Sequence, residues 1–545
     1  MRTPGAFHTA KSTQALLVAV AVTSLPEDVY MSARARKFLI VAVIVLGVLA
    51  LLSVLVVPIL VDVNRYRPEV AAYLEKRTGK PAQIGRLRLT LFPNLAIEVD
   101  DFILGNPKGF PHGDFFRAQR IYALLKPGPL WNRKVVIRSL VVENPDIHLL
   151  SNTSGHWNFE NPPQKESGKS DPAASGQGGF SLGTISKIEI NRGRLSIANL
   201  LPSGASGPVF FDGQGLSCQL QDVNLNALTA PQAGTLPSKQ AVSARVIPAR
   251  DNTAPSVAHG SFHADSVRFG AIEATSVNSK IQVFPKQAYL DDLSLKVAGG
   301  TIKGRAASDF SYQDLLYSIQ TTFEKIDVAQ LLNAFPTARG KMTGTMEGSL
   351  DLNGEAAHSS DPLSGLRGTG QVTIRNGKLP TLQLNKNLLL LVRMAGIGAS
   401  SGDPAAFSLI TADLNLADQQ LVSRKVHIVS TDVDVDAAGS VLLTDAYPIS
   451  YSGTARVPAR QSGLTNLVAG LSGATFADGK LSFPFALEGT LESPRFVFKS
   501  AKGVLGGLAT PPSSGAGKNT QPGNAVQDLI NIFRKKQSSS PTPKQ

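Results

Sequence analysis

The residues best placed to do chemistry in this 545-residue chain are a run of aspartates and a pair of histidines. Asp432, Asp434 and Asp436 have the spacing of the first ligands of a calcium loop, but Ala437 stands where that loop needs a glycine and a leucine where it needs the closing glutamate. Valines alternate with the aspartates over residues 432–436, which is typical of a strand with one wet face. We therefore expect a strand rather than a calcium site.

The other chemical patterns are equally incomplete. His259 and His263 are four residues apart, as in a metal site on a helix, but Gly260 and the alternating neighbours indicate a strand or turn. The segment 368–370 reads Gly-Thr-Gly but lacks the strand-to-helix pattern of a nucleotide site, and we expect a turn there. No phosphate loop, nucleophile elbow or His-Glu-x-x-His helix occurs. We therefore expect a protein that is not an enzyme and that needs no cofactor or metal.

The element that positions the rest of the chain is an uncharged apolar run over residues 38–61. A helix of that length crosses a hydrocarbon core of roughly 30 Å, and we predict a transmembrane helix. Arg34, Arg36 and Lys37 precede the run and Asp62 follows it, so the basic residues predict a cytoplasmic N-terminus and an exported remainder. A cleaved secretory signal is the alternative, but the run is long for one and no small-residue cleavage site follows it. Residues 1–30 fit neither role, and Met31 is the better candidate for the first residue.

Composition agrees with a membrane-associated protein outside the cytoplasm. Cys218 is the single cysteine, so an internal disulfide is excluded. The net charge of +13 and the pI of about 9.6 suit an anionic lipid surface, and the basic residues are scattered rather than interleaved with aromatic ones, which argues against nucleic-acid binding.

Beyond the span, apolar residues alternate with polar ones in many short segments, which predicts half-exposed antiparallel strands. Turn signals separate them at Asn191-Arg192-Gly193, Asn376-Gly377 and Asp478-Gly479. About 25 strands in one sheet would extend for roughly 120 Å. The candidates for an apolar lining are Leu87, Leu89, Ile188, Ile190, Leu195, Ile197, Val372, Ile374, Val433, Val435, Leu481, Phe483, Phe485, Leu487, Phe496 and Phe498.

Other segments interrupt the strand pattern. Pro68 and Gly79 delimit a short helix after the span, in which Val70, Tyr73 and Leu74 share one face. The strands that follow are predicted from Arg86, over 134–142 and over 146–150. Residues 161–179 have the composition of a flexible linker. Further helices are predicted at 328–335 behind Asp327, at 382–397, at 464–471 and, as an amphipathic helix within a low-complexity tail, at 525–536.

Six short motifs in a fixed order resemble the N-terminal region of the AsmA family of bacterial envelope proteins. They follow the predicted span as Asn64-Arg65-Tyr66-Arg67-Pro68, Thr78-Gly79-Lys80, Leu91-Phe92-Pro93, Asn106-Pro107-Lys108-Gly109-Phe110, the segment from Leu140 to Pro145, and Gly155-His156-Trp157-Asn158-Phe159. The segment from Gly489 to Phe498 is similar to the closing part of the family, whereas the match between Phe180 and Gly340 is vague.

The resemblance implies a single-pass protein of the bacterial inner membrane whose mainly β periplasmic part is an elongated, curved antiparallel sheet with a few short helices. It also implies a groove that binds or transfers phospholipid in outer-membrane biogenesis. The implied partners are the inner-membrane bilayer, phospholipid and outer-membrane assembly proteins. The expected divisions are a cytoplasmic segment 1–37, a span 38–61, a family-like region 62–160, a linker 161–179, a β-rich groove region 180–500 and a tail 501–545.

Two alternatives remain open from the residues themselves. From alternation alone, the default arrangement is a sandwich of two sheets around a filled core, and only the resemblance favours the open groove. A protein with a filled core would be an envelope scaffold for outer-membrane protein assembly that carries no lipid. An anchored hydrolase would need a convergent polar pocket. If lipid is bound, Arg65, Arg67, Arg86 and Arg88 are the candidates for steering anionic headgroups.

Overall fold

The computed structural model describes most of the chain between residues 62 and 498. The described residues are 62–91, 94–130, 136–153, 156–159, 184–224, 250, 256–309, 315–336, 338–356, 365–380, 403, 405–444, 446–463, 465–466, 469, 473–491 and 493–498. The predicted span 38–61, the linker 161–179 and the helices predicted at 382–397 and 525–536 lie outside these residues, as does most of the helix predicted at 464–471. Within the described part, no helix is both long and apolar enough to cross a membrane.

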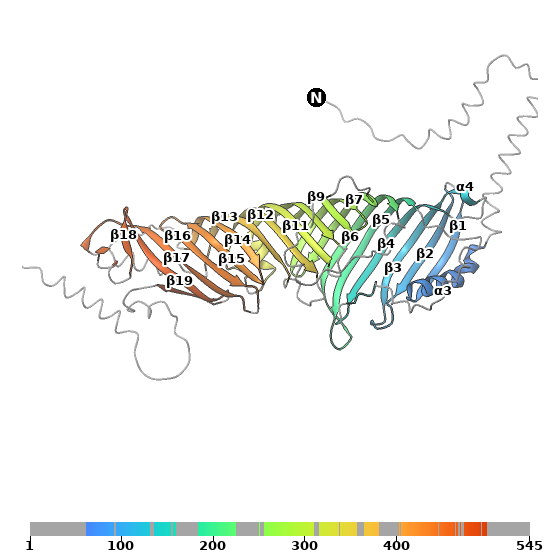
Figure 1. Ribbon diagram of the computed structural model, residues 1–545, viewed down its shortest axis with the longest axis horizontal. Coiled ribbons are helices and arrows are strands. Elements are labelled where there is room, and N and C mark those ends of the chain that lie inside the picture. The colour runs from blue at the N-terminus through green and yellow to red at the C-terminus, as the bar shows by residue number, and fades with distance from the viewer. Residues whose placement is uncertain are drawn as a thin grey trace, which may run out of the picture.

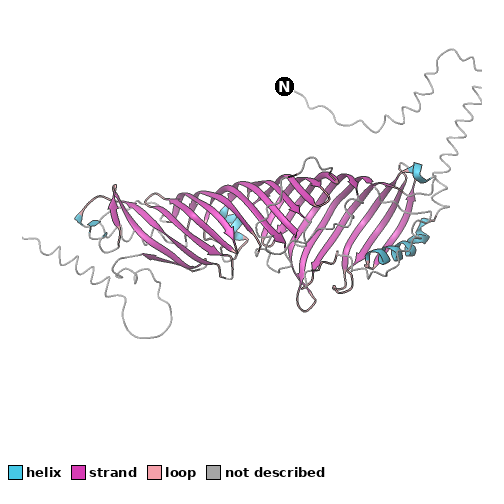
Figure 2. Cartoon of the chain, viewed as in Figure 1, coloured by secondary structure: helices cyan, strands magenta, loops and turns pink. Residues whose placement is uncertain are grey.

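The described chain is built almost entirely of strands (Figures 1 and 2). The strands are β1 (Ala82–Thr90), β2 (Ala96–Gly105), β3 (Asp114–Leu125), β4 (Ile137–Ser151), β5 (Thr184–Leu200), β6 (Ser206–Asn224), β7 (Ala258–Phe269), β8 (Ile272–Val283), β9 (Gln287–Val297), β10 (Gly300–Asp309), β11 (Leu315–Asp327), β12 (Thr343–Ala356), β13 (Arg367–Lys378), β14 (Ala406–Ala417), β15 (Gln420–Val429), β16 (Asp434–Leu442), β17 (Pro448–Pro458), β18 (Thr475–Ala477), β19 (Lys480–Thr490) and β20 (Pro494–Phe498). The helices are η1 (Val63–Tyr66), α3 (Arg67–Thr78), α4 (Pro127–Leu130) and α7 (Val328–Asn333).

All twenty described strands form one sheet, and nearly every strand pairs with the next strand along the chain. From β9 the order continues strand by strand to β17, which pairs with β19; β18 and β20 then share the outer edge of β19. Figure 1 shows the resulting long, twisted sheet, with β1 and β19 near its two ends. The mainly β, open, elongated sheet is therefore confirmed, and the described strands do not form a sandwich.

One pairing departs from the expected antiparallel pattern. β4 and β5 are parallel, with Leu140 opposite Ile188 and Leu149 opposite Ile197. A parallel pair needs a connection that returns from one end of the first strand to the start of the second, whereas a hairpin turn can join only antiparallel strands. The chain between Ser151 and Thr184, which contains the predicted linker, makes this return.

Residues with positive φ inside long strands explain two wrong boundary predictions. Residues 134–142 and 146–150 were expected to be separate strands, but β4 runs through both, with Asn144 at a φ of 48°. The predicted turn at Asn191-Arg192-Gly193 is a bulge within β5, where Arg192 has a φ of 54° and the register to β6 shifts. A bulge reverses the alternation of side chains and bends the strand, so a continuous strand looks interrupted in the sequence.

The first edge of the sheet is covered by η1 and α3. The Asn64 side chain accepts a hydrogen bond from the Leu87 backbone nitrogen at 3.1 Å, and the Arg67 guanidinium donates to the Gly85 carbonyl. These bonds satisfy backbone groups of an edge strand that would otherwise be open to pairing with another chain. The predicted end of α3 is confirmed, because Gly79 adopts the left-handed conformation and its nitrogen donates to the Glu75 carbonyl.

Candidate functional site

The two faces of the sheet differ sharply in chemistry, and the hydrogen-bond register defines them. Directly paired residues of neighbouring strands lie on the same face. One row of paired residues can be followed through every strand from β1 to β17 and on to β19, and each of its members is apolar or glycine. We call it the long row: Leu89, Ile97, Ala123, Leu140, Ile188, Leu220, Gly260, Ile281, Leu290, Ala306, Ile319, Leu352, Gly368, Leu416, Leu421, Val441, Ile449 and Gly489.

The long row crosses eighteen strands by seventeen pairings, which at about 4.8 Å each gives a length of roughly 80 Å. The expected 120 Å was too long because twenty strands, not about 25, are described and three of them share one end of the sheet. Ile449 is buried and Gly489 is exposed, but the other members are half-buried. All described strands belong to this one sheet, so no described second sheet packs on the face of the long row, which we call the apolar face.

Further apolar residues extend the apolar face beside the long row. Four clusters of packed side chains follow one another from β5 to β20 and share members. Ala274 and Leu295 join the first cluster to the second, Met346 and Val372 join the second to the third, and Ile428 joins the third to the last. The apolar contacts are therefore continuous along the sheet.

The structure brings the sixteen predicted lining residues to this one face. Leu89 and Ile188 belong to the long row, and Leu87 and Ile190 belong to the next row, which passes through Val142. Leu195, Val372 and Ile374 lie in the shared clusters, and Ile197 pairs with Leu149 and Phe211. Val433, Val435, Leu481, Phe483, Phe485, Leu487 and Phe496 lie at the far end, where Phe498 also pairs with Phe485.

At that far end the apolar face is filled by its own side chains. The C-terminal cluster consists of Val433, Val435, Ala455, Val457, Ala474, Leu481, Phe483, Phe485 and Phe496, each at most 8 % exposed. Phe483 and Leu481 are completely buried, and the rings of Phe485 and Phe496 stack with centroids 4.8 Å apart. These predicted lining residues form a closed core, so the accessible part of the apolar face lies elsewhere.

Near the middle of the sheet, α7 lies against the apolar face. Asp327 caps this helix as predicted, because its carboxylate accepts a hydrogen bond from the Gln330 nitrogen at 3.1 Å. Val328 is buried, and Leu331 and Leu332 pack on the clusters of β11 to β14. The helix therefore covers part of the apolar face away from the long row.

The opposite, polar face carries ion pairs in place of apolar contacts. Near β1, Arg88 and Arg120 each contact both Glu98 and Asp100 at 2.6–3.3 Å. Partial burial raises the pKa of Asp100, but hydrogen bonds and charge from Arg120 and Arg88 outweigh it, and the pKa falls below its ordinary value. Arg88, one of the four residues predicted to steer headgroups, therefore already forms ion pairs with two carboxylates.

The other three predicted headgroup residues lie at the same end of the sheet. Arg67 is engaged with the Gly85 carbonyl, and Arg86 is exposed opposite Asp100 of β2. Arg65 is exposed and its guanidinium stacks over the Tyr66 ring at 4.8 Å from the centroid.

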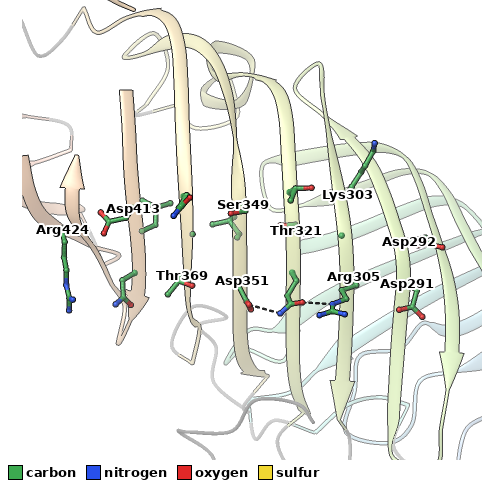
Figure 3. Close-up of a pocket in the computed structure, with 18 residues that line it drawn as sticks. Asp291, Asp292, Lys303, Arg305, Thr321, Ser349, Asp351, Thr369, Asp413 and Arg424 are labelled. Atoms are coloured by element: carbon green, nitrogen blue, oxygen red, sulfur yellow. Dashed lines mark hydrogen bonds between the residues drawn. The ribbon is translucent and has the colours of Figure 1, made fainter. Parts of the chain in front are cut away.

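A hollow of about 1130 Å³ opens on the polar face across β9 to β15 (Figure 3). Arg305 donates to Gln320 at 2.7 Å, and Gln320 donates to Asp351 at 2.9 Å, so the floor is a chain of hydrogen bonds across three strands. Lys303, Asp413 and Arg424 also line it, and none of the predicted lining residues does. Its mixed charges match no single ligand class.

The aspartates that resemble a calcium loop lie on or just before β16, and the strand interpretation is confirmed. Asp434 pairs with Lys480 at 3.1 Å, while Asp436 contacts Arg456 and lies 2.7 Å from His427. The hydrogen bond from Arg456 is the main cause that lowers the pKa of Asp436. Both carboxylates therefore already have cationic or histidine partners. His259 and His263 lie on β7, and within the described chain no group of three metal-binding side chains occurs.

One arrangement resembles a catalytic triad and was not anticipated. The Ser196 hydroxyl lies 2.7 Å from His148 Nδ1, and His148 Nε2 lies 3.3 Å from an Asp146 oxygen. Ser196 is only 7 % exposed, and it faces His148 in the middle of the β4–β5 ladder. An acyl-transfer site also needs free donors for the oxyanion, and the ladder uses the nearby backbone groups. We therefore interpret these three side chains as a hydrogen-bonded chain that joins β4 to β5, and not as a catalytic site.

Several of the short sequence motifs meet in one polar network beyond β2 and β4. Asn158 is completely buried; it accepts from the Leu150 nitrogen at 3.0 Å and donates to the Asn106 side chain at 2.8 Å and the His148 carbonyl at 2.7 Å. Lys80 donates to the Phe159 carbonyl at 3.2 Å, and burial lowers the pKa of Lys80. These residues hold the end of β4 to the segments around Asn106 and Phe159, so the sequence motifs that contain them are explained by a structural role.

Fold and surface together define a class of protein: a single long sheet, apolar on one face and charged on the other, whose apolar face is left half-buried. The AsmA family model matches residues 35–285 and 261–425, and the chain belongs to the AsmA family. No curated protein and no solved structure matches the chain.

Proposed function

We propose that this protein is a membrane-anchored lipid-binding protein of the bacterial envelope, whose apolar face shelters the acyl chains of phospholipids during transfer. The long row is the observation that carries the proposal, because it gives an apolar surface without a polar interruption across eighteen strands. Family membership is consistent with this role.

The mechanism is shielding without a chemical step. A half-buried aliphatic side chain is an incomplete core contact, and an acyl chain laid along the row would complete it. Each methylene removed from water contributes about 0.8 kcal/mol, which offsets the loss of the bilayer. Headgroups would remain in water beside the row, which passes near one end of most strands. Neither a cofactor nor a metal is required.

The accessible part of the surface runs from β1 to about β15, since the C-terminal cluster, which begins with Val433 and Val435, excludes a ligand beyond it. Arg65 is a candidate for meeting anionic headgroups, because it is exposed on η1, which contacts β1 at the first end of the row.

Photo-crosslinking in the full-length chain tests the proposal. A photoreactive side chain at Ile281 would replace a member of the long row, and the same group at Gln282 provides the control, because neighbouring residues of a strand point to opposite faces. We expect phospholipid adducts, identified by mass spectrometry, at 281 and far fewer at 282.

Equal labelling at both positions, or none at 281, would contradict lipid binding. Protein adducts at 281 without lipid would favour the alternative, a scaffold that docks envelope proteins on its apolar face.

A further inference from the structure

A stripe of exposed apolar side chains runs from the end of η1 along α3. Tyr66, Val70 and Tyr73 are 40 %, 38 % and 62 % exposed. Their spacing of four and three residues places them along one side of a helix. The sequence predicted that Val70, Tyr73 and Leu74 would share one face of this helix; of the three, only Leu74 is half-buried.

The packed side of α3 uses different residues. Arg67, Ala71, Leu74 and Thr78 are half-buried at intervals of three and four, and α3 contacts β1. The stripe is therefore not required to attach the helix to the sheet. An exposed line of two tyrosines and a valine needs another environment to cover it.

The surroundings of the stripe suit an anionic lipid surface. Arg65 stacks on the Tyr66 ring and bonds its hydroxyl at 2.7 Å, and Lys76 is exposed one turn beyond Tyr73. Glu69 is the exposed acidic residue nearest the stripe. Tyrosine combines an apolar ring with a polar hydroxyl and is therefore favoured at the boundary between headgroups and acyl chains.

The position of the stripe in the chain selects a bilayer over a protein partner. The apolar run 38–61 ends directly before Asp62, and η1 and α3 follow without a connecting loop. At about 2 Å per residue in η1 and 1.5 Å in α3, Tyr66 and Tyr73 lie within roughly 20 Å of the end of that run. A tethered surface binds at a high effective concentration, so three inserted side chains suffice where a free helix would dissociate.

We propose that α3 lies in the interface of a phospholipid bilayer that contains anionic lipid, with Tyr66, Val70 and Tyr73 inserted among the headgroups. Figure 1 shows α3 beside β1, so this contact would place the first strand of the apolar face at the membrane. If the proposed lipid binding holds, an acyl chain could then pass from the bilayer to the region of Leu89 with little exposure to water.

Depth-dependent quenching tests the contact. The background is the full-length protein with Cys218→Ser, into which a single new cysteine is introduced by Tyr73→Cys or by Glu75→Cys. An environment-sensitive fluorophore is attached to that cysteine. Each labelled protein is then reconstituted into vesicles of phosphatidylethanolamine and phosphatidylglycerol that contain spin-labelled lipid. Both positions are exposed on the same helix, but 75 points away from the stripe. We expect a blue shift and severalfold stronger lipid quenching at 73 than at 75.

Equally weak quenching at the two positions would overturn the proposed contact. Equally strong quenching would also overturn it, because it would mean that the whole helix, and not one side of it, is buried in the bilayer. Neither result would decide whether the long row binds lipid, because that question is answered at Ile281. Loss of crosslinking at 281 with quenching retained at 73 would remove the lipid-transfer role and leave the membrane contact of α3.

Discussion

The two ends of the sheet are stabilised in different ways. At the C-terminal end, nine buried residues fill the apolar face and two phenylalanine rings stack within it. Toward the N-terminal end, the long row is only half-buried, while hydrogen bonds and ion pairs connect the strands on the polar face. Smaller buried clusters, such as Ile185 with Val223 and Ala258, also lie at this end, but they leave the long row itself unfilled, so polar contacts should contribute a larger share of the stability there. The comparison predicts that apolar truncations will be costly at one end and polar ones at the other.

The largest effect is expected for Phe483→Ala in the C-terminal cluster. This ring is completely buried, and its truncation should destabilise β17 and β19 by about 3–5 kcal/mol. The matched change Ile281→Ala in the long row should cost only about 1 kcal/mol, because that side chain is half-buried. Local opening measured by hydrogen exchange compares the two. Similar costs would show that the long row is also part of a filled core.

The next effect is expected for Asn158→Ala. The buried amide makes three hydrogen bonds, and its removal leaves the Leu150 nitrogen and the Asn106 side chain without this partner, at a cost of about 2–3 kcal/mol. Faster exchange should appear at the end of β4 and around Asn106 and be absent from β17 to β19. Asn158→Asp places a buried carboxylate oxygen opposite the Asn106 and His148 acceptors, and should cost at least as much as Asn158→Ala. An unchanged exchange pattern would mean that polar contacts do not stabilise this end.

A smaller, pH-dependent effect is expected at Asp212 on the polar face. Burial to 4 % exposure raises the pKa of this carboxyl, but bonds from Gln214 and Arg194 and the charges of Arg194 and Arg268 lower it below its ordinary value overall. A lowered folded-state pKa means that the stabilisation is complete above the unfolded value of about 3.9 and is lost as the pH falls through the folded value. The contribution is about 1 kcal/mol, since both arginines are half exposed to solvent.

Hydrogen exchange in β5 to β7 measured from neutral pH down to acid conditions should show this loss. Asp212→Asn should lower stability at neutral pH and flatten the dependence below about pH 4. A mutant that keeps the wild-type acid dependence would assign it to other carboxyls.

The smallest effect is expected for Arg88→Gln. The ion pairs of Arg88 with Glu98 and Asp100 are partly exposed, so their loss should cost less than about 1 kcal/mol and should shrink further in high salt. Arg120 continues to neutralise both carboxylates. Denaturation of the mutant at low and high salt measures the difference. A loss above 2 kcal/mol would make this cluster a principal determinant of the N-terminal end.

The sequence predicts the faces of the strands better than it predicts their extent. Alternation assigned all sixteen lining candidates to one face, and Asp478-Gly479 was correctly recognised as a turn, here between β18 and β19 with φ values of 51° and 70°. Asn376-Gly377 has the same dipeptide chemistry but lies inside the end of β13. Both sites satisfy the same local preference for positive φ, and only the neighbouring strand decides whether the chain reverses or bulges.

The long row itself could not be predicted because it is a property of register. Ile97, Leu140, Leu220 and Ile281 have ordinary strand patterns, and their alignment depends on which residues pair across neighbouring strands, which the pattern of a single strand does not contain. β3 was missed for a related reason: its pairing with β2 and β4 skips Gln119, which interrupts the alternation. The open sheet was predicted from the resemblance to the family, whereas periodicity alone favoured a sandwich, because alternation identifies an apolar face without showing what covers it.

The pairing of almost every strand with its successor also determines how the sheet can assemble. Most of these pairs are joined by short loops, so most contacts are local in sequence and the entropic cost of bringing those strands together is small. The sheet can therefore lengthen one strand at a time during synthesis, with each new strand using the previous edge as its template. More than thirty residues separate β6 from β7 as well as β4 from β5, and of these two junctions only the one between β4 and β5 also requires a parallel crossover. That step is the expected kinetic pause in folding, and it divides assembly into an early four-strand unit and a later, longer one.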